Sequence, residues 1–160
     1  MAGAVGATDP APGRVELVRR PALVVAGEPA VGAFGELGEL VPAAWRRLLA
    51  RSDLPAPAGG RYAEASAGLG GGRYLEVVGV LLEAAADVPD ECALALLPAG
   101  RWARLLFEGP VSRIGDGFGE VLAWGERNGL ALGGRKLDVG YAADGREGPH
   151  ELSVQVLGAG

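Results

Sequence analysis

The chain has 160 residues, of which 49% are hydrophobic, and a formal net charge of −5. This length and apolar fraction favour one folded domain and argue against a disordered chain. Acidic and basic residues are interspersed, without the concentrated basic face that nucleic acids require, and the apolar runs are too short to cross a bilayer. We therefore expect a protein that binds neither nucleic acid nor membrane.

The first residues, 1–13, are rich in Ala, Gly and Pro and predict a flexible tail ahead of a domain over residues 14–158. They lack the cationic start and apolar segment of a secretion signal, so we expect a cytoplasmic protein. They are also too few for a helix-turn-helix, which favours a stand-alone module. The single cysteine, Cys92, lies in an apolar run and is expected to be a buried structural thiol.

Extended runs at 15–20 and 22–27 predict a strand that is broken or bulged at Pro21, because proline cannot donate to a sheet. From 31 to about 52, apolar residues recur every three or four positions, which predicts a helix. Pro42 removes a backbone donor, so this helix either kinks or begins close to Leu40.

Two further runs, 61–66 and 73–83, predict a β-hairpin around the glycine-rich turn 68–72. A phosphate-binding loop is disfavoured there, since no helix signature and no Lys-Ser or Lys-Thr pair follows the glycines. The run 91–98 predicts another strand.

The second half repeats the first at a spacing of about 80 residues: a strand at 101–107, a helix ending near Trp124, and strands at 136–141 and 150–157. This predicts an α+β fold made of a pseudo-twofold tandem repeat of a strand-helix-strand-strand unit. The halves would span about 14–84 and 91–158, with a largely antiparallel sheet, two main helices and a central groove for a ligand.

The order and spacing of several short motifs resemble the gyrase-inhibitory-protein-like (GyrI-like) small-molecule-binding domain over roughly residues 15–157. The matching motifs are the helix ending in Trp45, the strand Tyr74–Val80, Leu97–Trp102, Phe107–Pro110 leading to a helix that ends at Trp124 with Gly125–Gly129, and Leu137–Tyr141. Such domains also serve as effector-binding modules of multidrug-sensing bacterial regulators.

The resemblance implies a lipophilic, often cationic ligand held by one acidic residue in an aromatic-lined pocket. The family's acid lies shortly before a tyrosine on the strand after the second helix, which here corresponds to Asp138 and Tyr141. This chain has Asp where the family has Glu, and one extra residue before the tyrosine. Asp138 faces either the groove or solvent, and Tyr141 would point to the other side of a regular strand unless Gly140 marks a bulge.

The other candidate ligand-binding residues are aromatic side chains that would line the groove or fill the core, and one further acid. These residues are Trp102, Tyr62, Tyr74, Trp124, Phe107 and Glu76. A metal site and a Ser-His-Asp triad are disfavoured because His150, expected at a strand edge, is the only histidine. We expect no cofactor.

Two functions remain open. The first is a binding protein that senses, sequesters or confers resistance to a hydrophobic compound, neutral or cationic, as a monomer or dimer and with or without a protein partner. The second follows from the resemblance, because some GyrI-like proteins are hydrolases that open cyclopropane rings in natural products. In a hydrolase or isomerase of this kind, Asp138 would be the general base and either Tyr141 or a tryptophan would orient the substrate.

Overall fold

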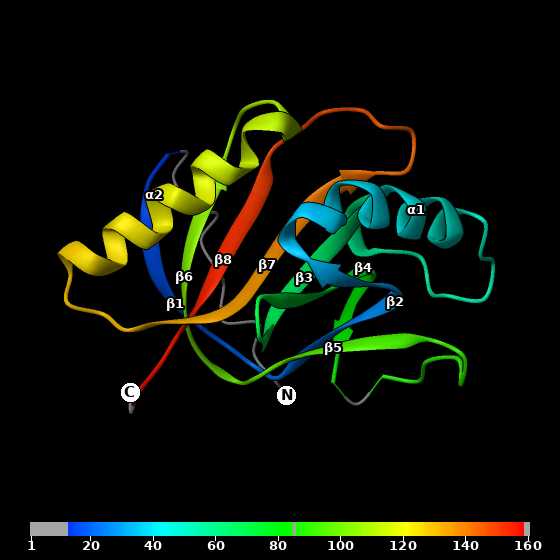
Figure 1. The fold of residues 1–160 in the computed structure, drawn as a ribbon, viewed down its shortest axis with the longest axis horizontal. Helices are drawn as coiled ribbons and strands as arrows, with labels where there is room; N and C mark the ends of the chain where they lie inside the picture. The colour runs from blue at the N-terminus through cyan, green and yellow to red at the C-terminus, as the bar shows by residue number, and fades with distance from the viewer. Residues whose placement is uncertain (1–12, 85, 159–160) are drawn as a thin grey trace.

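The computed structural model describes residues 13–84 and 86–158, and these form one antiparallel sheet covered by two helices (Figure 1). The strands are β1 (Val15–Arg20), β2 (Leu23–Ala33), β3 (Arg61–Gly70), β4 (Arg73–Glu83), β5 (Ala93–Leu97), β6 (Gly100–Phe107), β7 (Leu132–Ala142) and β8 (His150–Val156). The helices are α1 (Leu37–Leu49) and α2 (Ile114–Arg127), each preceded by a short 3-10 turn. The predicted α+β class, antiparallel sheet and two main helices are confirmed. The expected tail lies, apart from Gly13, outside the described residues.

The strand order is β1-β6-β8-β7-β3-β4-β2-β5. From the β1 edge to the centre, the first strand of the N-terminal half, β1, is followed by the second, fourth and third strands of the C-terminal half, β6, β8 and β7. From the other edge, the first strand of the C-terminal half, β5, is followed by β2, β4 and β3 of the N-terminal half. The halves predicted at 14–84 and 91–158 therefore exchange their first strands. A repeated unit would give this order, although the repeat itself stays a prediction. The third strands, β3 and β7, meet at the centre of the sheet.

Pro21 separates β1 from β2, and the two strands go to different parts of the sheet. Val15 to Arg20 pair with β6, whereas β2 pairs with β4 and β5. The break expected at Pro21 is thus a complete change of partner, which the sequence pattern alone did not indicate.

The first helix is shorter than the range 31–52 that its periodicity predicts. Residues 31–33 belong to β2 and pair with β4, and a 3-10 turn at 34–36 follows. Glu36 accepts a hydrogen bond of 2.9 Å from the backbone N–H of Ala33 where the chain turns. The helix begins at Leu37, three residues before Leu40, and contains Pro42.

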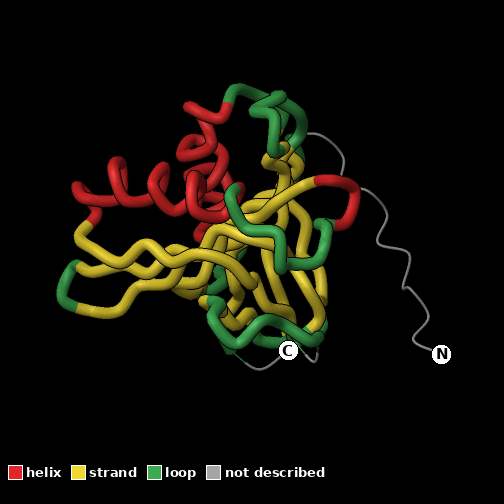
Figure 2. The backbone as a smooth tube through the Cα atoms, turned by 90° about the vertical axis from the view of Figure 1, so that its right-hand side faces the viewer, coloured by secondary structure: helices red, strands yellow, loops and turns green. Residues whose placement is uncertain are grey.

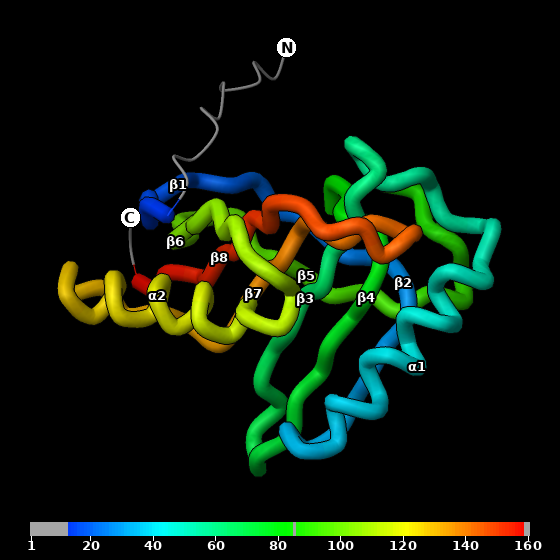
Figure 3. The backbone as a smooth tube through the Cα atoms, turned by 90° about the horizontal axis from the view of Figure 1, so that it is seen from above, coloured from blue at the N-terminus to red at the C-terminus, as the bar shows by residue number. Residues whose placement is uncertain are grey.

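Both helices lie on the same face of the sheet, and the β3–β4 hairpin extends past the sheet toward the start of α1 (Figures 2 and 3). Helix α1 packs on β2 and β4, while α2 packs on β6 and β8. The buried residues between α1 and the sheet include Ala44 of α1 and Val78 of β4, and those between α2 and the sheet include Val121 of α2 and Leu105 of β6. A third cluster, which contains Trp102, fills the face that carries no helix. The core is thus divided between the two faces, and the space between the helices is left for side chains of the central strands.

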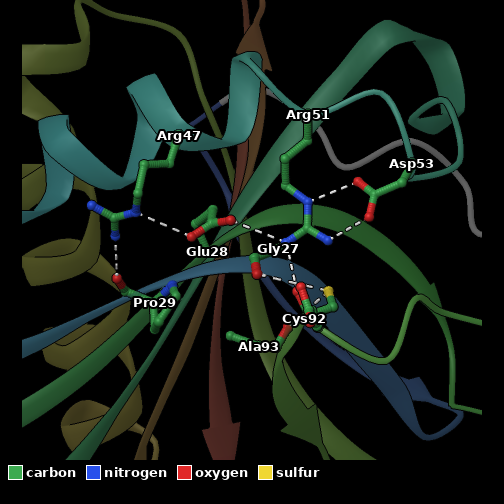
Figure 4. Close-up of polar contacts among 9 residues, drawn as sticks. Gly27, Glu28, Pro29, Arg47, Arg51, Asp53, Cys92 and Ala93 are labelled. Atoms are coloured by element: carbon green, nitrogen blue, oxygen red, sulfur yellow. Dashed lines mark hydrogen bonds and ion pairs between the residues drawn. The ribbon is translucent and has the colours of Figure 1, made fainter.

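A polar network anchors the C-terminal end of α1 to the sheet (Figure 4). Arg51 binds both carboxylate oxygens of Asp53, at 2.8 and 2.7 Å, and Oε1 of Glu28 at 3.0 Å. Arg47 binds Oε2 of Glu28 at 3.1 Å. Cys92 lies beside this network, half buried, and burial raises the pKa of its thiol. The network holds α1 in place at one side of the central strands.

No helix in residues 13–84 and 86–158 has the length and apolar character needed to cross a membrane.

Candidate functional site

A cavity of about 500 Å³ lies between the two helices and the central strands. Most of its wall is apolar and comes from the turn before α1, from the start of α1, from β4 and from α2. The apolar lining residues are Phe34, Leu37, Tyr74, Ile114, Phe118 and Leu122. Phe34 is 78% exposed and meets Tyr74 edge to face, with ring centroids 6.3 Å apart. These two rings therefore border the opening of the cavity.

The polar residues of the cavity lie in two adjacent rows set by the strand register. In one row Glu64 of β3 is opposite Asp138 of β7. In the next row Ser66 of β3 lies between Glu76 of β4 and Lys136 of β7. Side chains two positions apart on a strand point to the same face, so all five residues face the helices. The sheet register thereby gathers three carboxyl groups and one ammonium group in one cavity.

Glu64 is the carboxyl group whose protonation the cavity changes most clearly. Burial raises its pKa to about 7, an effect opposed by a hydrogen bond from Trp45 and reinforced by the nearby Glu76 and Asp138. Nε1 of Trp45, on α1, donates to Oε1 of Glu64 at 2.5 Å. Glu64 is therefore held by the helix and changes charge near neutral pH.

Asp138 is only 3% exposed, and each of its carboxylate oxygens has a partner. Nδ1 of His150 lies 2.6 Å from Oδ1, and the Tyr141 hydroxyl donates to Oδ2 at 2.7 Å. His150 is 1% exposed and starts β8, so it is a buried partner of the acid and not the strand-edge residue that was expected. Asp138 faces the cavity side of the sheet but has both oxygens engaged by the protein.

Tyr141 joins the helix to the central strands. Its ring lies 4.9 Å from the Trp45 ring and 4.7 Å from the His150 ring, centroid to centroid. Burial raises the pKa of its hydroxyl, and Asp138 and Glu64 raise it further by repulsion of the phenolate. The hydroxyl therefore stays protonated as a hydrogen-bond donor in this acidic surrounding.

Glu76 and Lys136 form the charged part of the second row. Burial raises the pKa of Glu76, as does the charge of Asp138, while the Lys136 ammonium lowers it. Nζ of Lys136 lies 5.4 Å from the centre of the Phe118 ring, a cation–π distance. The lysine thus extends from the sheet onto the aromatic wall formed by α2.

Four of the predicted ligand-binding residues line this cavity: Asp138, Tyr141, Tyr74 and Glu76. The other four lie elsewhere. Trp102 is 1% exposed in the cluster on the helix-free face, and Tyr62 packs beneath α1 against Trp45. Trp124 is part of α2 and packs against the buried cluster between this helix and the sheet, and Phe107 packs beside Gly109 and Gly117. Ala103 packs under α2. Because neighbouring residues on a strand face opposite sides of the sheet, Trp102 faces away from the helices.

The site residues expected from the sequence did not include Glu64, Lys136, Phe118, Phe34 or His150. A usable signal existed for Glu64 because this acid alternates with Ala63 and Ala65, which are small and buried. Phe118 and His150 carry no such local signal, since their roles depend on contacts between distant segments. Within residues 13–84 and 86–158, no three His, Cys, Asp or Glu side chains are grouped so as to hold a metal ion.

Comparisons with known proteins identify the fold. No protein-family model matches the chain, and no curated protein matches it. Solved structures do match: SAV2435 bound to tetraphenylphosphonium is 12% identical with a TM-score of 0.65, over 91% of this chain and 94% of that one. The EcmrR C-terminal domain is 16% identical with a TM-score of 0.58, over 91% and 98%. A hydrolase from Listeria innocua is 16% identical with a TM-score of 0.57, over 92% and 94%. The chain therefore has the fold of the GyrI-like small-molecule-binding domains.

Proposed function

We propose that this domain binds a hydrophobic organic cation in the cavity between α1, α2 and the central strands. The observation that carries the proposal is the composition of the cavity, which combines an aromatic and aliphatic wall with the carboxyl groups of Glu64, Glu76 and Asp138. Aromatic faces and a poorly solvated carboxylate attract a cation that sheds water easily. A volume of about 500 Å³ suits a small organic molecule.

Glu64 is the residue we assign to the ligand's positive charge. Asp138 already accepts hydrogen bonds on both oxygens, whereas Glu64 is bonded through Oε1 to Trp45. A cation near Glu64 would favour its ionised form and gain an attraction strengthened by burial. The tetraphenylphosphonium held by SAV2435, a protein of the same fold, is a lipophilic cation of this chemical kind.

Isothermal titration with tetraphenylphosphonium and with neutral triphenylphosphine oxide tests the proposal. We expect binding of the cation and at least tenfold weaker binding of the neutral compound. Glu64→Gln should weaken cation binding about tenfold, while the control Glu83→Gln, an exposed acid at the end of β4, should leave it unchanged. Equal affinity for both compounds, or no effect of Glu64→Gln, would count against the proposal.

A hydrolase is the second candidate, and the pKa of Glu64 near 7 is the observation that favours it. A general base works best with a pKa near the operating pH. Here Glu64 would take a proton from water while the hydroxyl adds to an electrophilic cyclopropane carbon, and the protonated Glu64 would then return that proton to the carbon released as a carbanion by ring opening. Asp138 would position the Tyr141 hydroxyl and would not itself be the base. Mass spectrometry should then show that the compound gains the mass of one water molecule with wild-type protein and does not gain it with Glu64→Gln. If the compounds are recovered unchanged from wild-type protein, the hydrolase candidate is excluded and only binding remains.

A further inference from the structure

Lys136 has a position in the cavity that simple cation binding does not explain. It is the only lysine of the chain, and it is the only cationic side chain among the described residues that line the cavity. A domain that binds cations would gain more attraction from a neutral residue at this position.

The ammonium group of Lys136 lies where a ligand's cation would gain a favourable contact. Its Nζ is 5.4 Å from the centre of the Phe118 ring, inside the range of about 6 Å in which a cation is attracted to an aromatic face. No ion pair within 4.0 Å is found for Lys136 among the residues that the structure describes. The lysine therefore occupies the aromatic wall without being fixed to one acid.

Lys136 offsets part of the negative charge of the cavity. Asp138 has each oxygen engaged, by His150 and by Tyr141, which leaves Glu64 and Glu76 facing one ammonium group. Across the strands, Lys136 and Glu76 are separated only by the small side chain of Ser66. With Lys136 set against one of these two acids, the other remains for a ligand.

We propose that Lys136 is a built-in competing cation that restricts the ligand to a single positive charge and selects against dications. This rests on the proposed cation-binding function and adds the ligand's charge to it. A second positive centre in a cavity of about 500 Å³ would lie close to the lysine and be repelled, or would have to displace it from Phe118. Lys136 is thus a specificity-determining residue, while Glu64 is the attracting one.

The test uses two probes of nearly equal shape and different charge, N-methyl-4-phenylpyridinium with one positive charge and methyl viologen with two. Wild-type protein should prefer the monocation. Lys136→Met, which keeps side-chain length without charge, should tighten dication binding about tenfold and monocation binding at most about threefold. Lys136→Arg should keep the wild-type preference because it keeps the charge.

Arg46→Met is the matched control, since it removes one positive charge from an exposed position on α1 and should leave the preference unchanged. Circular dichroism and thermal unfolding establish that each variant is folded. Failure of Lys136→Met to bind the dication more tightly, or an equal gain in Arg46→Met, overturns the role of Lys136. If instead the wild-type protein binds no tetraphenylphosphonium, the proposed function itself fails, so the two failures are distinguishable.

Discussion

The Tyr141 hydroxyl donates a hydrogen bond of 2.7 Å to Oδ2 of Asp138, although the two residues are three positions apart on one strand. In a regular strand such residues point to opposite faces. The pairing with β3 shifts between Tyr62 and Ala63, which leaves Gly140 as an extra residue on β7. The sequence-based expectation was that Tyr141 could join Asp138 only if Gly140 marked a bulge, and the structure contains that bulge.

Gly140→Ala should destabilise the protein and disrupt this pair. A Cβ at Gly140 would lie 2.7 Å from Cγ of His150 and 2.7 Å from the Pro149 carbonyl oxygen, too close to be accommodated without moving the backbone. We expect the free energy of unfolding in urea to fall by about 2 kcal/mol. Gly134→Ala on the same strand is the control, because a Cβ there meets nothing within 4 Å. Equal stability of the two variants would contradict the close packing at Gly140.

The buried pair of Asp138 and His150 should be strongly coupled in stability. His150→Phe leaves Oδ1 of a 3%-exposed carboxylate without its donor, and we expect a loss of about 2–4 kcal/mol. In the Asp138→Asn background, the same replacement should cost less by at least about 1 kcal/mol, because no carboxylate remains to be left unpaired. Additive effects in this double-mutant cycle would show that the interaction between the two side chains adds nothing to the free energy of unfolding.

Cation binding should strengthen as the pH rises through neutrality. The pKa of Glu64 is about 7, so the carboxylate is mostly protonated at pH 6 and mostly ionised at pH 8. Affinity for tetraphenylphosphonium should therefore be about tenfold weaker at pH 6 than at pH 8. The groups facing Glu64 are Trp45, Glu76, Asp138 and Tyr141. In Glu64→Gln the pH dependence should nearly vanish. A variant that keeps the wild-type pH profile would show that a group other than Glu64 causes the pH dependence.

Glu64→Gln should also stabilise the unliganded protein at high pH. Burial raises the pKa of Glu64 from its ordinary value of 4.5 to about 7, so its ionisation favours the unfolded chain. Wild-type stability from this group is full below pH 4.5 and decreases as the pH rises through 7. We expect Tm of the variant to exceed that of wild type by about 3 °C or more at pH 8.5, with little difference at pH 4.5. A lower Tm at pH 8.5 would contradict this assignment.

Arg51→Met should loosen the end of α1 and cost about 1–2 kcal/mol of stability in urea unfolding. The guanidinium group binds Glu28 and Asp53, and its side chain is only 15% exposed. The control Arg47→Met removes a contact to the same Glu28 from a side chain that is 50% exposed, so it should cost less than about 0.5 kcal/mol. Equal losses would show that burial of the Arg51 pair adds no stability.

Local patterns were sufficient to predict most helices and strands. The hairpin at 61–83, the strand at 136–141 and the helix ending near Trp124 follow from alternation, from helical periodicity and from glycine at turns, which are properties of neighbouring residues. The boundary near Val31 was predicted wrongly because apolar residues at 31, 34 and 37 fit a helical spacing. The pairing of Gly32 and Ala33 with β4 extends β2 through this region instead.

Sequence alone indicated the α+β class, the resemblance to GyrI-like domains, and the possibility that a bulge at Gly140 brings Tyr141 to Asp138. The exchange of first strands, the burial of Trp102 on the helix-free face, and the gathering of Glu64, Lys136 and Phe118 around one cavity required the tertiary structure. The physical reason is the separation along the chain over which each signal acts, because alternation and periodicity involve only a few neighbouring residues. Strand partners and the face that a helix covers are decided instead by contacts between segments tens of residues apart.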